Sequence, residues 1–371
     1  MIGLSDIFMT IWFLPLIGFI LSLIITLIVV RTAPLHARFT ADTHDGPQKI
    51  HQNITPRIGG VAIFLAMFVS MMIADFLGLF DVHLISFVAI GATIPVFLGG
   101  LLEDITGRVS PRMRLLLAIL SGACFVYLSN FTITRVSFAP MDVLLAVPLI
   151  SAGFSIFAIT LFANAVNIID GLNGLSIGTT ILIAGVIAGV TGGVGDIQLM
   201  TISMVFAASV LGVGLFNFPK GKIFVGDGGA YFMGAFVAFL LIMLPERNEA
   251  VSPFVSLLLV IYPSYELVRS TIRRLIARDS KALQPDQKHL HSLVYQYCMR
   301  LNKTTILNPN ARAGFIMLIF PIFTSLWTFV SVSSAEYAII GILILIAVYE
   351  FSLRWILRAE NAKNSNEKSI S

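Results

Sequence analysis

Long apolar runs separated by short polar segments dominate the pattern along the 371-residue chain. A helix needs about 20 apolar residues to cross the hydrocarbon core of a bilayer, and hydropathy finds about eleven runs near this length. The pattern therefore predicts an all-α, polytopic integral membrane protein. The runs cover residues 7–30, 58–80, 84–102, 113–130, 143–162, 175–191, 198–216, 229–244, 252–270, 313–332 and 337–357.

Composition agrees with the pattern, since 57% of the residues are hydrophobic and only 12% are charged. A soluble globular domain does not have this balance. We expect one transmembrane catalytic domain over residues 1–358, a disordered polar tail over 359–371, and no nucleic-acid partner. Cys124 lies in an apolar run and Cys298 in a polar segment, so the sequence predicts no disulfide framework.

Basic residues fall almost entirely on alternate connecting segments, which hold 22 of the 24 Lys and Arg residues. Only Arg135 and Arg247 lie on the other set. The positive-inside rule places the basic set in the cytoplasm, which puts the N-terminus outside and the C-terminus inside. The expected cytoplasmic loops are 31–57, 103–112, 163–174, 217–228 and 271–312.

The stretch 162–178, FANAVNIIDGLNGLSIG, places Asn164, Asn167, Asp170 and Asn173 at the mouth of two apolar runs. Amides and a carboxylate at this depth are costly, and they are usually kept for binding or catalysis. Irregular backbone there is tolerated only where protein or a wet cavity covers it. The alternative is an ordinary polar turn between two helices.

A second polar group begins with Glu103 and Asp104 and continues with Arg108, Arg112 and Arg114. Neighbouring carboxylates beside guanidinium groups suit a metal–phosphate site, because acids hold Mg²⁺ while cations offset phosphate charge. The alternative is a solvated acidic helix end beside cytoplasmic arginines.

The segment 224–229, FVGDGG, places Asp227 on a glycine-rich turn at the start of a predicted helix. Free amides and the helix dipole favour an anion such as phosphate at this position. The carboxylate favours a hard cation held between them. The alternative is that Asp227 is a plain N-cap.

Two further groups lie on the predicted cytoplasmic side. His289 and His291 share a face only in extended structure, and no other Cys or His stands at zinc-finger spacing. We interpret them as donors to phosphate or sugar oxygens, with a solvated loop pair as the alternative. Lys49 and Arg57 are interpreted as a basic group that binds anionic lipid headgroups, and the alternative is that they only follow the positive-inside rule. The pair Gly59-Gly60 after them permits close helix packing.

Together, these groups predict an Mg²⁺ site for a pyrophosphate substrate with a lipid phosphate as acceptor. A transporter or flippase for an anionic lipid or a nucleotide sugar is the alternative from another class of function. Transporters more often place polar groups near mid-membrane, on paired discontinuous helices.

The motif NAVNIIDGLNGL followed by FVGDGG resembles those of the polyprenyl-phosphate N-acetylhexosamine-1-phosphate transferases, and the resemblance runs from about Lys49 to His291. This family includes the undecaprenyl-phosphate GlcNAc-1-phosphate transferases and the phospho-MurNAc-pentapeptide translocase. The resemblance implies transfer of sugar-1-phosphate from a UDP-N-acetylhexosamine to undecaprenyl phosphate, with release of UMP. GlcNAc is the default sugar, and GalNAc, QuiNAc and FucNAc are alternatives. It also implies the bacterial inner membrane, contact with its lipids, an active site on the cytoplasmic face, and a homodimer as one option.

The resemblance also implies roles for individual residues. Asp227 and Asn167 would be ligands of Mg²⁺, with Mn²⁺ as an alternative ion. Asp170 is a further candidate for a catalytic residue, and Asn164 is a further candidate for a substrate-binding residue. The remaining assignments are Glu103 and Asp104 as the acidic pair, Arg112 as a phosphate ligand, Asn173 as a uracil contact, and His289 and His291 near the pyrophosphate.

Three positions depart from the family pattern. Glu103 stands where the family usually has Asp, which leaves Asp104 the better candidate for a direct role. Asn173 replaces the second acid of the DGxDG pattern, which argues against a catalytic carboxylate there. Ser292 stands where another histidine is usual. Together they suggest a subfamily whose sugar differs from the commonest one.

Two mechanisms are open at this point. A polyprenyl phosphate is largely dianionic at neutral pH, because the second pKa of a phosphate monoester is about 6. It can therefore attack the β-phosphate of the donor directly, given charge neutralisation and in-line positioning. Alternatively, Asp104 is a nucleophile that forms a phosphosugar-enzyme.

Overall fold

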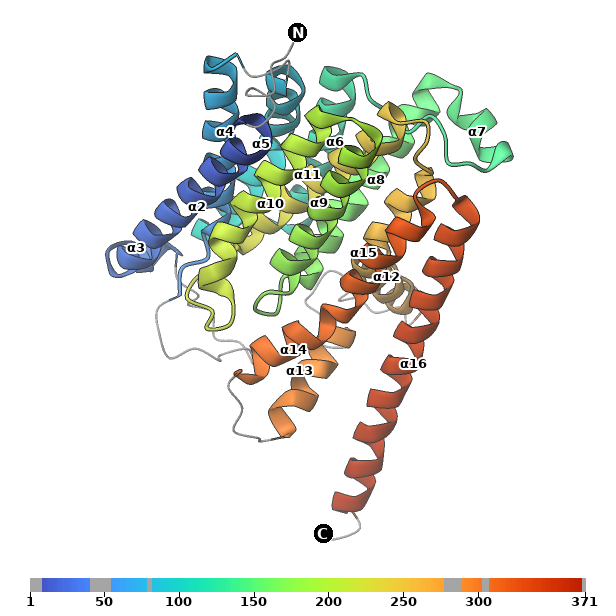
Figure 1. Ribbon diagram of the computed structural model, residues 1–371. Helices are drawn as coiled ribbons and strands as arrows, with labels where there is room; N and C mark the ends of the chain where they lie inside the picture. Colours follow the sequence, from blue (N-terminus) through green and yellow to red (C-terminus); the bar gives the residue numbers. More distant parts are fainter. Residues whose placement is uncertain (1–8, 41–54, 79–81, 277–288, 302–306, 369–371) are drawn as a thin grey trace.

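A computed structural model describes residues 9–40, 55–78, 82–276, 289–301 and 307–368, so the expected site residue Lys49 lies outside the described residues. Every regular element in these ranges is a helix (Figure 1). The elements are η1 (Met9–Phe13), α2 (Leu14–Arg31), α3 (Ala33–Thr40), α4 (Gly59–Phe76), α5 (Val82–Thr106), α6 (Pro111–Ser129), α7 (Ala139–Leu145), α8 (Pro148–Ile169), α9 (Leu175–Val194), α10 (Ile197–Asn217), α11 (Gly226–Arg247), α12 (Pro253–Ile276), α13 (Leu290–Arg300), α14 (Pro309–Met317), α15 (Ile319–Ser331) and α16 (Ala335–Lys368).

Ten helical segments among the described residues are long and apolar enough to cross a membrane. This confirms the predicted all-α, polytopic membrane protein. The expected run 252–270 forms α12, which is not among the ten. Glu266 and Arg269 interrupt its apolar sequence, and Arg273 and Arg274 follow in its last turn. Which end of the bundle faces the cytoplasm stays a prediction.

The sequence places the helix boundaries through local chemistry. Ser110 precedes α6, and its hydroxyl accepts the backbone N–H of Met113 at 3.3 Å. Pro111 then occupies the first helical position, where a missing N–H costs nothing. Between α9 and α10, Asp196 accepts the N–H of Leu199 at 3.1 Å. Such caps satisfy amides that a helix leaves unbonded at its start.

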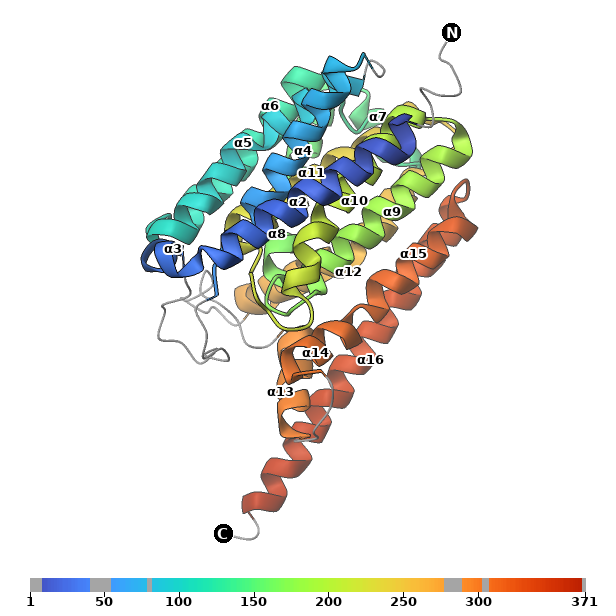
Figure 2. The same cartoon turned by 60° about the vertical axis from the view of Figure 1, so that its left-hand side comes forward.

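Helix α11 is the central element, and its candidate span is buried along the whole length. It packs against α4, α5, α8 and α9 (Figures 1 and 2). Buried phenylalanines surround it, and the rings of Phe125 and Phe239 stack with centroids 4.1 Å apart. A helix that is apolar on all sides belongs in an interior. Its first turn carries Asp227, so the packing of α11 fixes where that carboxylate stands.

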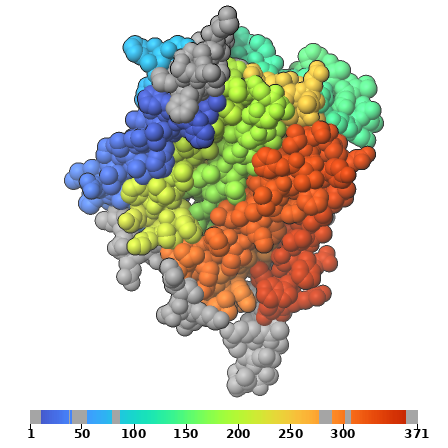
Figure 3. Space-filling view, viewed as in Figure 1, coloured from blue at the N-terminus to red at the C-terminus, as the bar shows by residue number. Residues whose placement is uncertain are grey.

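Helices α12 to α16 form a group on one flank of the bundle (Figures 1 and 2). Figure 3 shows the orange-to-red segments of this group on the flank opposite the blue α2. A second apolar core lies within it and includes Leu172, Leu290, Leu293 and Tyr349. This core joins the turn after α8 to α13 and α16, and it therefore brings α13 to the polar turn at 170–174.

The last helix is longer than the sequence suggested. Helix α16 runs to Lys368, through ten residues of the segment expected to be a disordered tail. Alanine, glutamate and lysine in this segment are good helix formers, so a helix that has started can continue through it. Its far end lies at the opposite end of the bundle from the start of α2 (Figure 2).

Candidate functional site

Five separate segments bring three carboxylates and two guanidinium groups together at one end of the bundle. Asp104 lies in the last turn of α5, Asp170 caps the end of α8, and Asp227 lies in the first turn of α11. Arg57 precedes α4, and Arg114 lies near the start of α6. The expected gathering of these carboxylates on one side of the protein is therefore observed.

Asp104 holds the start of α11 from a neighbouring helix. Its two carboxylate oxygens accept the backbone N–H groups of Asp227 and Gly228, each at 2.9 Å, and its side chain is 1% exposed. These are amides that a helix start leaves unbonded. The expectation that both amides are free for a phosphate is therefore wrong, because Asp104 occupies them. A direct catalytic role for Asp104 stays a prediction.

Backbone pairing joins the first turn of α4 to the turn before α11. The amides of Gly59 and Gly60 donate to the carbonyls of Phe224 and Val225, both at 2.9 Å. Gly226 follows with a φ of +76°, and a Cβ there would collide with the carbonyl oxygen of Arg57. Only glycine tolerates both the φ and the contact. This pairing sets Arg57 beside the acidic cluster.

Asp227 carries two guanidinium neighbours. Arg114 donates a short hydrogen bond from NH1 to Asp227 Oδ2. The guanidinium of Arg57 lies 4.0 Å from Asp227 Oδ1 and 4.0 Å from Asp104 Oδ1. Arg112, the residue that the motif match assigned to phosphate, is exposed at the start of α6. The structure therefore brings Arg114 to Asp227, and the role of Arg112 stays a prediction.

Asp170 is also enclosed within the cluster. Ser176, in the first turn of α9, donates a short hydrogen bond to its Oδ1. Burial raises the pKa of the Asp170 carboxyl to about 7, although the bond from Ser176 acts in the opposite direction. The charges of Asp227 and Arg57 also act on this pKa, upward and downward respectively, so all three groups share one electrostatic environment.

The amides of α8 face the first turns of α11. Tyr231 donates from its hydroxyl to Asn164 Oδ1 at 3.2 Å, and Asn164 Nδ2 donates to the carbonyl of Thr160 at 2.8 Å. Asn167 follows three residues later and is half-buried. Residues three apart share one side of a helix, so Asn167 lies on the side that carries Asn164. Its role as a metal ligand stays a prediction.

Two of the predicted contacts are used inside the protein. Asn173 is 2% exposed; its backbone N–H donates to Asn310 Oδ1 at 2.6 Å, and its Nδ2 donates to the carbonyl of Pro219 at 3.3 Å. Glu103 accepts the N–H of Val109 at 2.7 Å and holds the turn after α5. The uracil contact of Asn173 and a catalytic role of Glu103 stay predictions.

The two predicted histidines lie at the start of α13, and both are buried. Each faces the carboxylate of Glu266 on α12 through its Nδ1 atom. They are therefore not a solvated pair in an open loop.

The donor set of the cluster fits a hard divalent cation. Asp227 offers a carboxylate that is 16% exposed, and Asn167 offers an amide oxygen one helix away. Mg²⁺ prefers oxygen ligands of this kind. The Glu266, His289 and His291 group could also hold a metal ion, and its nitrogen atoms suit softer cations.

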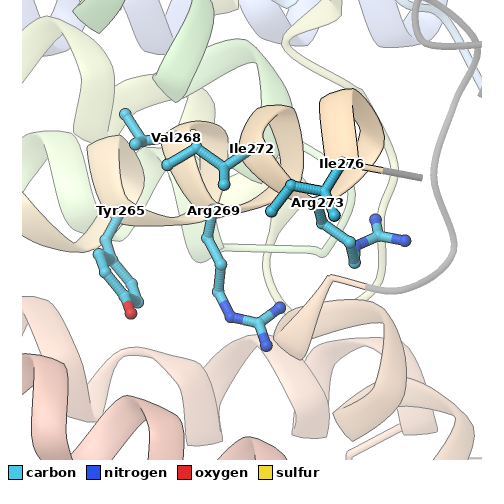
Figure 4. A pocket seen from close by; sticks show the side chains of 6 residues that line it. All are labelled: Tyr265, Val268, Arg269, Ile272, Arg273 and Ile276. Atoms are coloured by element: carbon cyan, nitrogen blue, oxygen red, sulfur yellow. The ribbon is translucent and has the colours of Figure 1, made fainter. Parts of the chain in front are cut away.

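A cavity of about 560 Å³ lies beside α12 and is separate from the three carboxylates. Figure 4 shows side chains that extend from one side of this helix toward its neighbours. Arg269 bridges from there to Glu350 on α16, with Nε and Oε1 2.6 Å apart. The cavity is lined by Tyr265, Val268, Arg269, Ile272, Arg273 and Ile276.

Sequence reasoning missed several partners in this region. Glu266 stood inside the apolar run 252–270, and a carboxylate within such a run is itself a signal of a special role. Arg114 was grouped with the cytoplasmic arginines, because nothing in the sequence separated it from Arg112. Tyr231 and Ser176 are ordinary helix residues, and only the packing of α8, α9 and α11 brings them to the cluster.

The fold and the cluster define an integral membrane protein that gathers three carboxylates and two guanidinium groups at one end of its helix bundle. A model described as glycosyl transferase family 4 matches residues 84–245. One relative is the putative UDP-N-acetylglucosamine--dolichyl-phosphate N-acetylglucosaminephosphotransferase of Saccharolobus solfataricus. The chain is 31% identical to it over 233 residues, and these residues cover 60% of this chain and 67% of that protein. The chain belongs to glycosyl transferase family 4.

Two further relatives agree with this assignment. The probable undecaprenyl-phosphate N-acetylglucosaminyl 1-phosphate transferase of Bacillus subtilis is 27% identical over 280 residues, which cover 74% of this chain and 75% of that protein. The phospho-N-acetylmuramoyl-pentapeptide-transferase of Streptococcus pneumoniae serotype 19F is 29% identical over 257 residues, which cover 63% and 75%. The family resemblance predicted from the motifs is confirmed.

Proposed function

We propose that the protein transfers N-acetylhexosamine-1-phosphate from a UDP-N-acetylhexosamine to undecaprenyl phosphate and releases UMP. The observation that carries the proposal is the cluster of Asp104, Asp170 and Asp227 with Arg57 and Arg114 at one end of a membrane bundle. The names of the relatives support the lipid acceptor and the transferred group. GlcNAc is the default sugar, and its lipid-linked product would start a cell-envelope polysaccharide.

The reaction needs charge neutralisation more than a strong base. An oxygen of the lipid phosphate dianion attacks the β-phosphorus of the donor, and the bond from that phosphorus to the α-phosphate oxygen breaks. Arg57 and Arg114 lie where they would bind the anionic groups and hold them in line. The product is a lipid-linked diphosphate sugar, and the leaving group is UMP.

A divalent ion is part of the proposal. Asp227 and Asn167 would hold it, and bound Mg²⁺ or Mn²⁺ would offset the charge of the pyrophosphate. Direct attack is favoured over a phosphosugar-enzyme, because both oxygens of Asp104 accept backbone N–H groups at the start of α11. A nucleophilic Asp104 would have to give up one of these bonds.

The proposed setting is the inner membrane of a bacterium, with the cluster on the cytoplasmic face. Cytosolic UDP-sugars would reach the cluster from that side, and the phosphate of the lipid would reach it from the inner leaflet. The basic residues of the connecting segments support this orientation.

The test is a panel of UDP-sugars with undecaprenyl phosphate, Mg²⁺ and purified protein, scored by UMP release and by lipid product. We expect one N-acetylhexosamine donor to give both products only when the lipid and the metal are present. A transporter or flippase would instead move a substrate across vesicles without forming UMP. Absence of lipid product with every donor would contradict the proposed transfer.

A further inference from the structure

Glu266 is a buried carboxylate whose surroundings come from three helices. It lies on α12 and is 1% exposed. Its Oε2 is 3.0 Å from Nδ1 of His289, and its Oε1 is 3.5 Å from Nδ1 of His291. Its charge acts electrostatically on two buried phenols, those of Tyr262 on α12 and Tyr349 on α16. A carboxylate this deep requires partners that compensate its lost hydration.

His289 Nδ1 lies within hydrogen-bond distance of Glu266, whereas His291 Nδ1 and Glu266 Oε1 face each other at 3.5 Å and neither atom has another partner among the described residues. An ionised carboxylate only accepts hydrogen bonds, so an imidazole that bonds to it carries a proton on Nδ1. The two rings stack with centroids 5.2 Å apart and an interplanar angle of 13°, and both turn the same nitrogen toward Glu266. Their Nε2 atoms are therefore left for other partners.

One of these Nε2 atoms points to the acidic cluster. A methyl group placed on Gly171 would lie 3.7 Å from Nε2 of His291. Gly171 directly follows Asp170 in the chain, so this distance places Nε2 of His291 beside the turn that carries Asp170. Leu172 and Leu290 pack in the same apolar core, which holds the start of α13 against the turn at 170–174.

We propose that Glu266 is a positioning residue: it fixes the Nδ1–H form of His289 and His291 and thereby directs Nε2 of His291 toward the space beside Asp170 and Gly171. This inference rests on the proposed transferase function, in which His291 Nε2 would meet the phosphates of the donor. Carboxylates that orient an imidazole through one nitrogen set what its other nitrogen can do.

Glu266→Gln is the variant that separates orientation from packing. The amide keeps the shape of the side chain but offers one acceptor and one donor group in place of two acceptors. It can therefore satisfy one Nδ1–H, while the second imidazole must move its proton to Nε2. Glu350→Gln is the matched control, since Glu350 is also a carboxylate between α12 and α16 but bonds Arg269 and Tyr265.

The first measurement is turnover. We expect Glu266→Gln to lower kcat/KM for the UDP-sugar by about 10- to 100-fold, while Glu350→Gln stays close to the wild type. The melting temperatures of the two variants, taken in parallel, should fall by similar amounts. Equal loss of kcat/KM in both variants would mean that Glu266 is only a tether between helices, which would overturn the proposal.

The second measurement does not depend on the transferase reaction. ¹⁵N-histidine NMR of the wild type should show two of the six histidines in the Nδ1–H form, and Glu266→Gln should shift at least one of them to Nε2–H. If the wild type fails to transfer sugar but shows this change, the proposed function fails and the positioning role stands. An Nε2–H form for both histidines in the wild type would overturn the inference. So would stoichiometric zinc that is lost in Glu266→Gln.

Discussion

Asp227 is bound by two arginines that differ in how closely they approach. Arg114 donates to one oxygen of the carboxylate, and Arg57 stands 4.0 Å from the other and also faces Asp104. Arg57 therefore lies between the carboxylates of Asp104 and Asp227, whereas Arg114 pairs with Asp227. In the proposed reaction, a phosphate or a metal ion at Asp227 would have to share this carboxylate with Arg114.

Replacement of Arg114 by Ala should lower kcat/KM for the UDP-sugar by about 100-fold, since it removes a partly buried cation from the developing charge. Arg108→Ala, in the same connecting segment and exposed, is the matched control and should stay near the wild type. UMP release gives both values. Equal turnover in Arg114→Ala and the control would show that Arg114 is only structural.

Asp170 should make stability depend on pH. Burial raises the pKa of its carboxyl to about 7 in the folded protein, from 3.8 as its ordinary value. A raised folded pKa means that the unfolded state releases its proton first as the pH rises. The stability associated with the protonated carboxyl is then complete below about pH 4 and is lost as the pH rises through about 7.

The corresponding measurement compares the wild type with Asp170→Asn in detergent with EDTA, so that no metal ion interferes. The melting temperature of the wild type should fall relative to the variant between pH 4 and pH 7, because the amide does not titrate. A constant difference between the two proteins across this range would contradict a raised pKa at Asp170.

At the scale of elements, the start of α11 depends on the close approach of α4. A Cβ on Gly60 would collide with the backbone of Gly229, so the two helices meet without side chains between them. The same segments pair through their backbones before α4 and α11 begin. This contact holds Asp227 and Arg57 at a fixed distance from each other.

Gly60→Ala should lower the free energy of unfolding by about 1–3 kcal/mol, because the added methyl group has no space. Gly91→Ala on α5 is the matched control, since a Cβ there meets nothing within 4 Å. Alanine favours a helix over glycine, so this control should be neutral or stabilising by up to about 1 kcal/mol. Melting curves of the two variants give the comparison, and an equal loss would refute the contact.

The elements themselves were largely predictable, because a bilayer imposes both the length and the apolar character of a helix. Hydropathy predicted most of the membrane helices, and the alternation of basic connecting segments predicted that Asp104, Asp170 and Asp227 lie at one end. Hydropathy could not predict α13, because its 11 residues do not form a long apolar run. It also could not decide between Arg112 and Arg114, since the rotation of α6 depends on packing against neighbouring helices.

For the whole molecule, the prediction is that the end of the bundle with the cluster faces the cytoplasm. Single cysteines at Lys220 and Glu249, both exposed, report on the two ends once Cys124 and Cys298 are replaced. A membrane-impermeant maleimide should label position 249 from outside the plasma membrane, and position 220 only after the cells are lysed. The opposite pattern would invert the proposed topology.

The proposed function requires that Asp227 acts in the transfer of a phosphorylated sugar to a lipid. UDP-GlcNAc labelled with ³²P in the β-phosphate follows that group directly. Asp142→Asn is the control, because the Asp142 carboxylate accepts the N–H of Val136 far from the cluster. If GlcNAc is the sugar, label should enter the lipid extract with the wild type and with the control. In an Asp227→Asn variant that still inserts into the membrane, the rate of labelling should fall by about 100-fold or more, as expected for the loss of one key electrostatic group. Label entering lipid at the wild-type rate in Asp227→Asn would contradict the central claim.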